Sequence, residues 1–220
     1  MSSTTIGGVE SARAKLEEMI LSGKMQPGDR LNELALASSF GISRSHLREA
    51  VRALEEARLV DVVANRGAQV RKLDLANALE LFDVRAGLAR SAGRLAVLRA
   101  SRQLIKEIQA THRRLGVAAS SGDMAKFRDH NARFHALLME AAANERLSEM
   151  DLAVRNELQL YIRRNISSEA QLRLSCEEHD RIVAALLAGD SDACGAAFER
   201  HILNGKRRLT DSAPIGASPD

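Results

Sequence analysis

The sequence contains no tryptophan, one tyrosine and only 3% aromatic residues in a chain of 220. A core with so few aromatic side chains must be built from Leu, Ala, Val and Ile, which favours helices packed on helices over a β-sandwich. The only prolines are Pro27, Pro214 and Pro219, so no helix-breaking residue lies between positions 28 and 213. No apolar run reaches the roughly 20 residues that a membrane-spanning helix needs. We therefore expect a mostly helical protein with no membrane segment.

Cysteine is also scarce. Cys176 and Cys194 are too few for a disulfide framework, and we expect them to be small buried side chains. The first ten residues lack the basic and then apolar pattern of a secretory signal, which predicts a cytoplasmic protein. The net charge of +3 neither requires nor excludes a nucleic-acid partner, because binding to nucleic acid depends more on basic residues gathered on one surface than on the net charge of the chain.

The first third of the chain has the pattern of a winged helix-turn-helix. Apolar residues at helical spacing predict helices over 12–21, 32–40 and 44–54. The β-branched run 60–64 and the short run 68–71 flank an Asn-Arg-Gly turn signal and predict a two-stranded hairpin. A helix, a glycine-containing turn, a second helix with a basic first turn and then a hairpin is an arrangement that enters the DNA major groove.

The third predicted helix carries the chemistry for reading DNA on its exposed face. Its apolar residues recur on the opposite face, and its polar end offers hydroxyl, imidazole and guanidinium groups. Arginine can form a bidentate contact with guanine, and an arginine at a wing tip can lie along phosphate or enter the minor groove. The alternative is a solvated helix whose arginines form ordinary ion pairs. The predicted DNA contacts are Ser43, Arg44, Ser45, His46, Arg48 and Arg66.

From Asp74 onward the pattern is helical throughout. Two breaks, 121–123 and 188–190, combine a glycine that can end a helix with an aspartate that can cap the next one. We predict a DNA-binding domain over 1–73, an all-helical domain over 74–212 and a frayed tail over 213–220.

Several polar residues of this second segment lie on apolar helix faces. Asn131 and His135 are four residues apart, and His179 and His201 fall on two later helices. A single such histidine is usually a satisfied core residue, but three on separate helices weaken that interpretation and suggest a site for zinc, nickel or a similar divalent metal. Arg85, also on an apolar face, would need a negative partner, which a bound carboxylate could supply. His112 and His130 are predicted to face solvent.

Two sets of motifs resemble a known family. The runs 20–33 and 41–55 and the turn 65–67 resemble the opening, the recognition helix and the wing tip of the GntR family of bacterial transcription regulators. The runs 131–135, 178–186 and 199–202 resemble the FCD ligand-binding domain of its FadR-like subfamily. This resemblance implies a winged helix-turn-helix followed by an all-α helical-bundle effector domain that forms the dimer.

The resemblance also implies a function. Arg44, Arg48, Arg66 and Gly67 would contact DNA, while the metal ligands would be Asn131, His135, His179 and His201, with Arg85 facing an organic-acid effector. The chain departs from the family pattern at Leu34, often arginine, at His46, usually proline, and at Ala89, where a glutamate is common. We predict a homodimeric repressor of catabolic genes that binds a palindromic double-stranded DNA operator and is not an enzyme. The alternatives are a metal-dependent hydrolase, for which no carboxylate is clearly placed as general base, and an architectural DNA-binding protein without effector.

Overall fold

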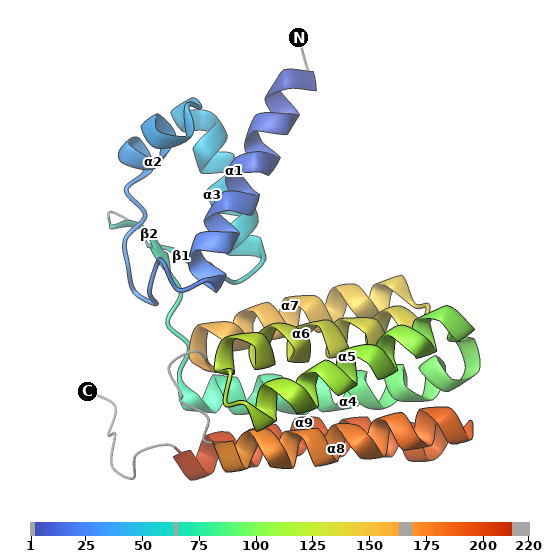
Figure 1. The fold of residues 1–220 in the computed structure, drawn as a ribbon. Coiled ribbons are helices and arrows are strands. Elements are labelled where there is room, and N and C mark those ends of the chain that lie inside the picture. The colour runs from blue at the N-terminus through green and yellow to red at the C-terminus, as the bar shows by residue number, and fades with distance from the viewer. Residues whose placement is uncertain (1–2, 64–65, 163–168, 213–220) are drawn as a thin grey trace. The chain divides into compact units, whose positions relative to one another are not determined.

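The computed structural model describes residues 3–63, 66–162 and 169–212, and its architecture is the predicted one: a helix-turn-helix with a small wing, then a helical domain (Figure 1). The described residues form two compact units. One contains the chain up to Ala78 together with the end of a later helix from Arg155, and the other contains the remaining helices. The predicted tail, 213–220, lies outside the described residues. No helix in the described part of the chain is long and apolar enough to cross a membrane.

The first unit begins with three helices, α1 (Ser3–Leu21), α2 (Glu33–Phe40) and α3 (Arg44–Glu56), of which α1 and α2 both pack on α3. The side chain of Asn32 caps α2 by accepting the amide of Ala35, and Gly41 ends the helix with a left-handed φ of 66°. These two signals fix α2 between them, because they satisfy backbone groups that a short helix leaves unpaired.

The wing is an antiparallel hairpin of β1 (Val60–Val63) and β2 (Gly67–Val70), in which Val60 pairs with Val70 and Val63 with Gly67. The second strand begins one residue before its predicted start, at Gly67, whose φ of 78° suits a residue without a Cβ. Asn65 of the predicted turn lies outside the described residues.

The second unit is built from helices of 18 to 25 residues. Their bounds are α4 (Leu75–Arg99), α5 (Arg102–Ser120), α6 (Met124–Ala141), α7 (Glu145–Ile162), α8 (Glu169–Ala188) and α9 (Ser191–Ser212). Both predicted breaks are confirmed: Gly122 and Gly189 have positive φ, and Asp123 and Asp190 accept the backbone amides of the helices that follow. Two further breaks, after α4 and after α6, were not predicted.

Helix α5 packs on α6 and α8, and α8 packs on α9 (Figure 1). Helices α4 and α9 approach so closely that a Cβ added at Gly93 would lie 2.8 Å from the carbonyl oxygen of Cys194. The buried apolar side chains between the helices are mostly aliphatic, as the composition predicts: Ile108, Leu115, Phe134, Leu137, Leu138, Ile182 and Phe198. Cys194 is buried among them and Cys176 is half-buried.

Candidate functional site

The amino end of α3 carries predicted DNA-contacting residues, which are exposed except for the half-buried His46. Ser43 caps the helix by accepting the amide of His46, and its hydroxyl lies 2.8 Å from that of Ser45. Arg44 and Arg48 are exposed on one face, while the opposite face is buried through Leu47, Ala50, Val51 and Leu54. The helix is therefore anchored by its apolar face, and its exposed face carries two arginines.

An ion pair with Glu33 holds the Arg48 side chain in place. Its Nε donates a hydrogen bond of 2.9 Å to Glu33 Oε2 at the start of α2, and this pair joins the two helices of the motif. Arg66 and Gly67 are both exposed at the tip of the wing, where the Arg66 amide donates to the carbonyl of Val63. Arg66 thus places a cationic side chain beside the exposed first residue of β2.

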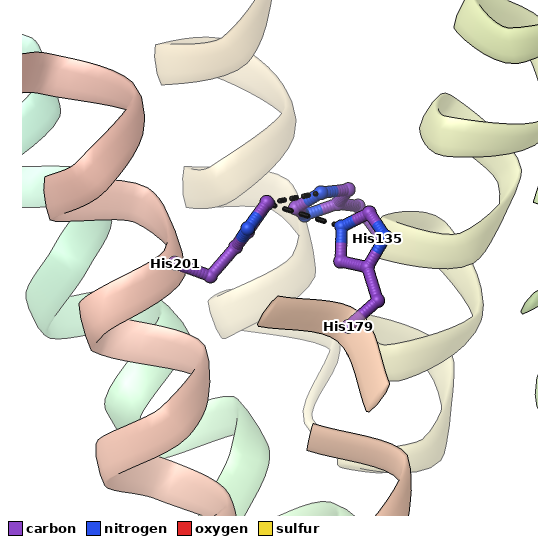
Figure 2. A group of neighbouring side chains, drawn as sticks. All are labelled: His135, His179 and His201. Atoms are coloured by element: carbon purple, nitrogen blue, oxygen red, sulfur yellow. Dashed lines mark hydrogen bonds between the residues drawn. The ribbon is translucent and has the colours of Figure 1, made fainter. Parts of the chain in front are cut away.

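The three predicted histidines of the helical unit converge. His135 on α6, His179 on α8 and His201 on α9 are all buried, and Figure 2 shows the three rings pointing toward one another. His201 Nε2 lies 3.1 Å from His135 Nε2 and 3.2 Å from His179 Nε2. Ligand atoms of all three lie within 4.8 Å of one another, which is a spacing that could hold one metal ion.

Burial favours the neutral form of two of the three rings, His179 and His201. Burial lowers the pKa of His179 well below 6.5, and the neighbouring His201 adds to this effect. Burial also lowers the pKa of His201, although its hydrogen bond to Glu178 opposes the shift. A neutral imidazole keeps a lone pair on one nitrogen, which is the form that binds a metal.

Asn131 lies one helical turn before His135 on α6, and its Oδ1 is buried without a hydrogen-bond partner among the described residues. A buried carbonyl oxygen with no partner is costly unless something else satisfies it. Three buried imidazoles form a neutral donor set that suits zinc, nickel or another borderline divalent cation, and the amide oxygen of Asn131 would be a fourth donor. The residues present therefore fit a metal.

Arg85, on α4, lies against this cluster. Its Nη2 is 3.4 Å from His135 Nδ1, and its Nε donates a hydrogen bond of 3.0 Å to Asp151 Oδ1 on α7. Arg85 and Asp151 are 8% and 2% exposed. The negative partner that a buried arginine requires is thus supplied in part by the protein itself.

Comparison with known families assigns both halves of the chain. Residues 9–70 match the model of bacterial regulatory proteins of the gntR family, and residues 80–204 match the FCD domain. The chain belongs to the GntR family of FCD-containing regulators. Among curated relatives, it is 31% identical to the Nta operon transcriptional regulator of Aminobacter aminovorans, over 84% of this chain and 86% of that protein. It is 27% identical to the transcriptional repressor GlaR of Escherichia coli, over 86% of this chain and 89% of that protein.

Solved structures of GntR regulators share the fold. The E. coli protein McbR/YncC superposes with a TM-score of 0.76 at 24% identity, covering 96% of this chain and 99% of its own. A putative GntR regulator from Rhodococcus sp. RHA1 superposes equally well at 22% identity, covering 93% and 98%. The family matches make the regulator one of GntR type with an FCD effector domain, and the solved structures show the same fold.

One sequence prediction about this GntR regulator was wrong. His112 was expected to face solvent, but its side chain is only 15% exposed and its Nε2 lies 2.7 Å from Asp180 Oδ1. The His112 ring lies edge-on to His179, with ring centroids 6.3 Å apart. The reason is that α5 packs against α8, which covers this side of the helix. His130 is half-buried.

Sequence reasoning also missed Glu178, the residue before His179. Its carboxylate accepts hydrogen bonds from His201 Nδ1 at 2.7 Å, from Asn204 and from both terminal nitrogens of Arg208. Burial alone would raise the pKa of Glu178, but the hydrogen bonds from His201 and Arg208 outweigh it and lower the pKa to about 2. The available signal was its position: a carboxylate beside a candidate ligand can support a ligand on the neighbouring helix.

Proposed function

We propose that this GntR regulator is a cytoplasmic homodimeric repressor of catabolic genes that binds a palindromic operator and releases it when a small organic acid binds at a metal-containing site. The observation that carries the proposal is the meeting of three buried imidazole nitrogens in a domain joined to a DNA-reading fold. Relatives named as a galactonate operon repressor and a probable D-xylose utilization operon repressor support the assignment to catabolic genes.

In this proposal α3 enters the major groove and the wing follows the backbone. Arg44 and Arg48 contact base edges or phosphates. The side chains of Ser43, Ser45 and His46 contact the DNA strand near the amino end of α3. Arg66 and Gly67 contact the adjacent groove. All of these residues except the half-buried His46 are exposed, and the opposite face of α3 is buried, which supports the proposal. A dimer would read two half-sites about one helical turn apart.

Binding to DNA from upstream of the regulator's own gene tests this proposal, with fluorescence anisotropy as the readout and salt varied. We expect Arg44→Ala to weaken binding at least tenfold and to lower the salt dependence by about one ion. The control is Arg146→Ala on α7, which removes the same charge from a side chain that is 87% exposed outside the DNA-binding unit. Equal affinity of both variants would contradict the assigned interface.

The proposed metal ligands are Asn131, His135, His179 and His201. A metal held there would supply Lewis-acid charge, and Arg85 would donate hydrogen bonds to the carboxylate of an organic acid. Arg85 uses Nε for Asp151 and Nη2 for His135, and no hydrogen bond involves its Nη1 within the described part of the chain. That nitrogen supports the assignment of Arg85 to effector binding.

Metal content tests the site. Protein purified without a histidine tag should contain close to one equivalent of zinc or nickel, and His135→Ala should lose it. The matched control is His130→Ala on the same helix, whose side chain is outside the cluster and which should keep the metal. Retention of metal by His135→Ala would refute the ligand set.

A thermal-shift screen of small carboxylic acids tests the effector. An acid that binds the folded state raises the melting temperature, and its effect should fall in Arg85→Met. The same acid must weaken operator binding, because an effector shifts an equilibrium only if it binds the two states unequally. An architectural protein would show neither response.

The homodimer is supported by an apolar stripe on α4. Val84 and Leu98 are 52% and 71% exposed, and the half-buried Leu88 and Leu95 lie on the same face at helical spacing. Light scattering on Leu88→Glu, with Leu187→Glu on α8 as the control, tests this surface. We expect only the α4 substitution to yield monomers.

A regulator is preferred to a hydrolase because of how the nearby carboxylates are used. Glu178 is held by His201, Asn204 and Arg208, and Asp151 is held by Arg85. A general base must be able to accept a proton from a water molecule, but Glu178 already accepts hydrogen bonds from three side chains and Asp151 is paired with the Arg85 guanidinium.

A further inference from the structure

The carboxylate of Glu178 lies behind the histidine cluster, on the far side of the His201 ring. Oε2 accepts a hydrogen bond of 2.7 Å from His201 Nδ1, and the other nitrogen of the same ring, Nε2, faces His135 and His179. Glu178 and His201 are 8% and 6% exposed, so water does not compete freely for this bond. The two ring nitrogens of His201 therefore have separate tasks.

A neutral imidazole carries its proton on one nitrogen and a lone pair on the other. An ionised carboxylate accepts hydrogen bonds but cannot donate one, so its partner Nδ1 must carry the proton. The lone pair is then fixed on Nε2, the atom that points into the cluster. Ligating histidines commonly have such a carboxylate behind them, and losing it typically weakens metal binding 10- to 100-fold.

Glu178 is itself held in place by α9. Asn204 Nδ2 donates to Oε1 at 2.8 Å, and Arg208 donates to Oε1 at 2.7 Å and to Oε2 at 3.1 Å. His201, Asn204 and Arg208 are spaced by three and four residues, so one face of α9 surrounds one carboxylate of α8. Arg208 also supplies the positive charge that keeps a buried carboxylate ionised.

We infer that Glu178 is the positioning residue of the metal centre: it fixes the proton of His201 on Nδ1 and so presents the Nε2 lone pair, together with His135 and His179, to a divalent cation. The inference rests on the proposed metal site. It assigns to α8 two roles through adjacent residues, one that binds the ion and one that orients a ligand on α9.

Zinc titration of the full-length chain, in competition with a chromophoric chelator, tests the inference with Glu178→Gln. Glutamine keeps the shape of the side chain and removes its charge, so we expect zinc affinity to fall at least tenfold. The control is Glu177→Gln, the same substitution at the exposed neighbouring position, which should leave the affinity unchanged. Glu178→Asp keeps the charge that Arg208 needs and should recover part of the loss.

The second measurement is made on metal-free protein, so it does not depend on metal binding. Imidazole nitrogen–proton correlation spectra should place the proton of His201 on Nδ1 in the wild type and give a mixture of tautomers in Glu178→Gln. If the wild type binds no zinc but shows this tautomer shift, the proposed metal site fails and the positioning role stands. If Glu178→Gln keeps both the wild-type tautomer and the wild-type zinc affinity, the inference is overturned. Thermal melting in the presence of a chelator monitors folding of each variant.

Discussion

The buried pair of Arg85 and Asp151 gives the sharpest test of the energetics of this domain. Asp151→Ala removes the carboxylate that accepts the 3.0 Å hydrogen bond from Arg85 and leaves the guanidinium without its counter-charge. Breaking a buried pair by removing one partner costs about 3–5 kcal/mol in the free energy of unfolding. In a chain of this length about 1 kcal/mol shifts the melting temperature by roughly 2–4 °C, so we expect a fall of roughly 6–20 °C.

The assay is thermal unfolding followed by circular dichroism, with a chelator present. The control is Asp83→Ala, which breaks the exposed pair with Lys206 and should cost no more than about 1 kcal/mol. Millimolar acetate should raise the melting temperature of Asp151→Ala more than that of the wild type, because it offers the isolated guanidinium a carboxylate. A loss below about 1 kcal/mol for Asp151→Ala, or equal responses to acetate, would refute the view that Arg85 depends on a carboxylate.

Three further outcomes follow from the same structure. Gly93→Ala should destabilise the domain by more than about 1 kcal/mol, because the added Cβ would meet the backbone of α9. Gly87→Ala on the same helix has open space around the added Cβ and should stabilise the domain by about 0.5–1 kcal/mol. Chemical denaturation measures both changes in the free energy of unfolding. Metal-free protein should lose stability as the pH falls below about 6.5, because the pKa values of His179 and His201 are lower in the folded state than in the unfolded chain. The unfolded chain therefore takes up protons first. A free energy of unfolding that stays constant between about pH 7 and 5 would contradict this. Ser43→Ala should cost about 1 kcal/mol through loss of the α3 cap, measured by the same denaturation.

Helix ends were predictable where the chain carries a recognised signal. Gly122 and Gly189, each followed by aspartate, marked two helix boundaries correctly. The boundary after α6 has no glycine: Ala143 takes a φ of 45°, a conformation that alanine rarely adopts. Asn144 caps α7 by accepting the amide of Leu147, and Arg99 donates hydrogen bonds to the carbonyls of Ala142 and Ala143.

The three histidines could be chosen because each interrupts an apolar face, which is a local property. Partners on other helices could not, because Asp151 is 66 residues from Arg85 and only the packing of α4 with α7 joins them. Glu178 could not be chosen either, because adjacent residues on a helix point to different sides, and the sequence does not show that a single ring on α9 contacts both Glu178 and His179 through its two nitrogens.

The near-contact of backbones at Gly93 and Gly195 limits how the effector domain can move. Two helices separated by side chains can slide or roll past each other, but here main chain lies against main chain, and the ion pairs Arg90–Glu199 and Arg94–Asp192 flank the crossing. We therefore expect any displacement of α9, which bears His201, to move α4 together with it. Since α4 starts five residues after the end of β2, such a movement would act on the segment that leads directly to the winged helix-turn-helix.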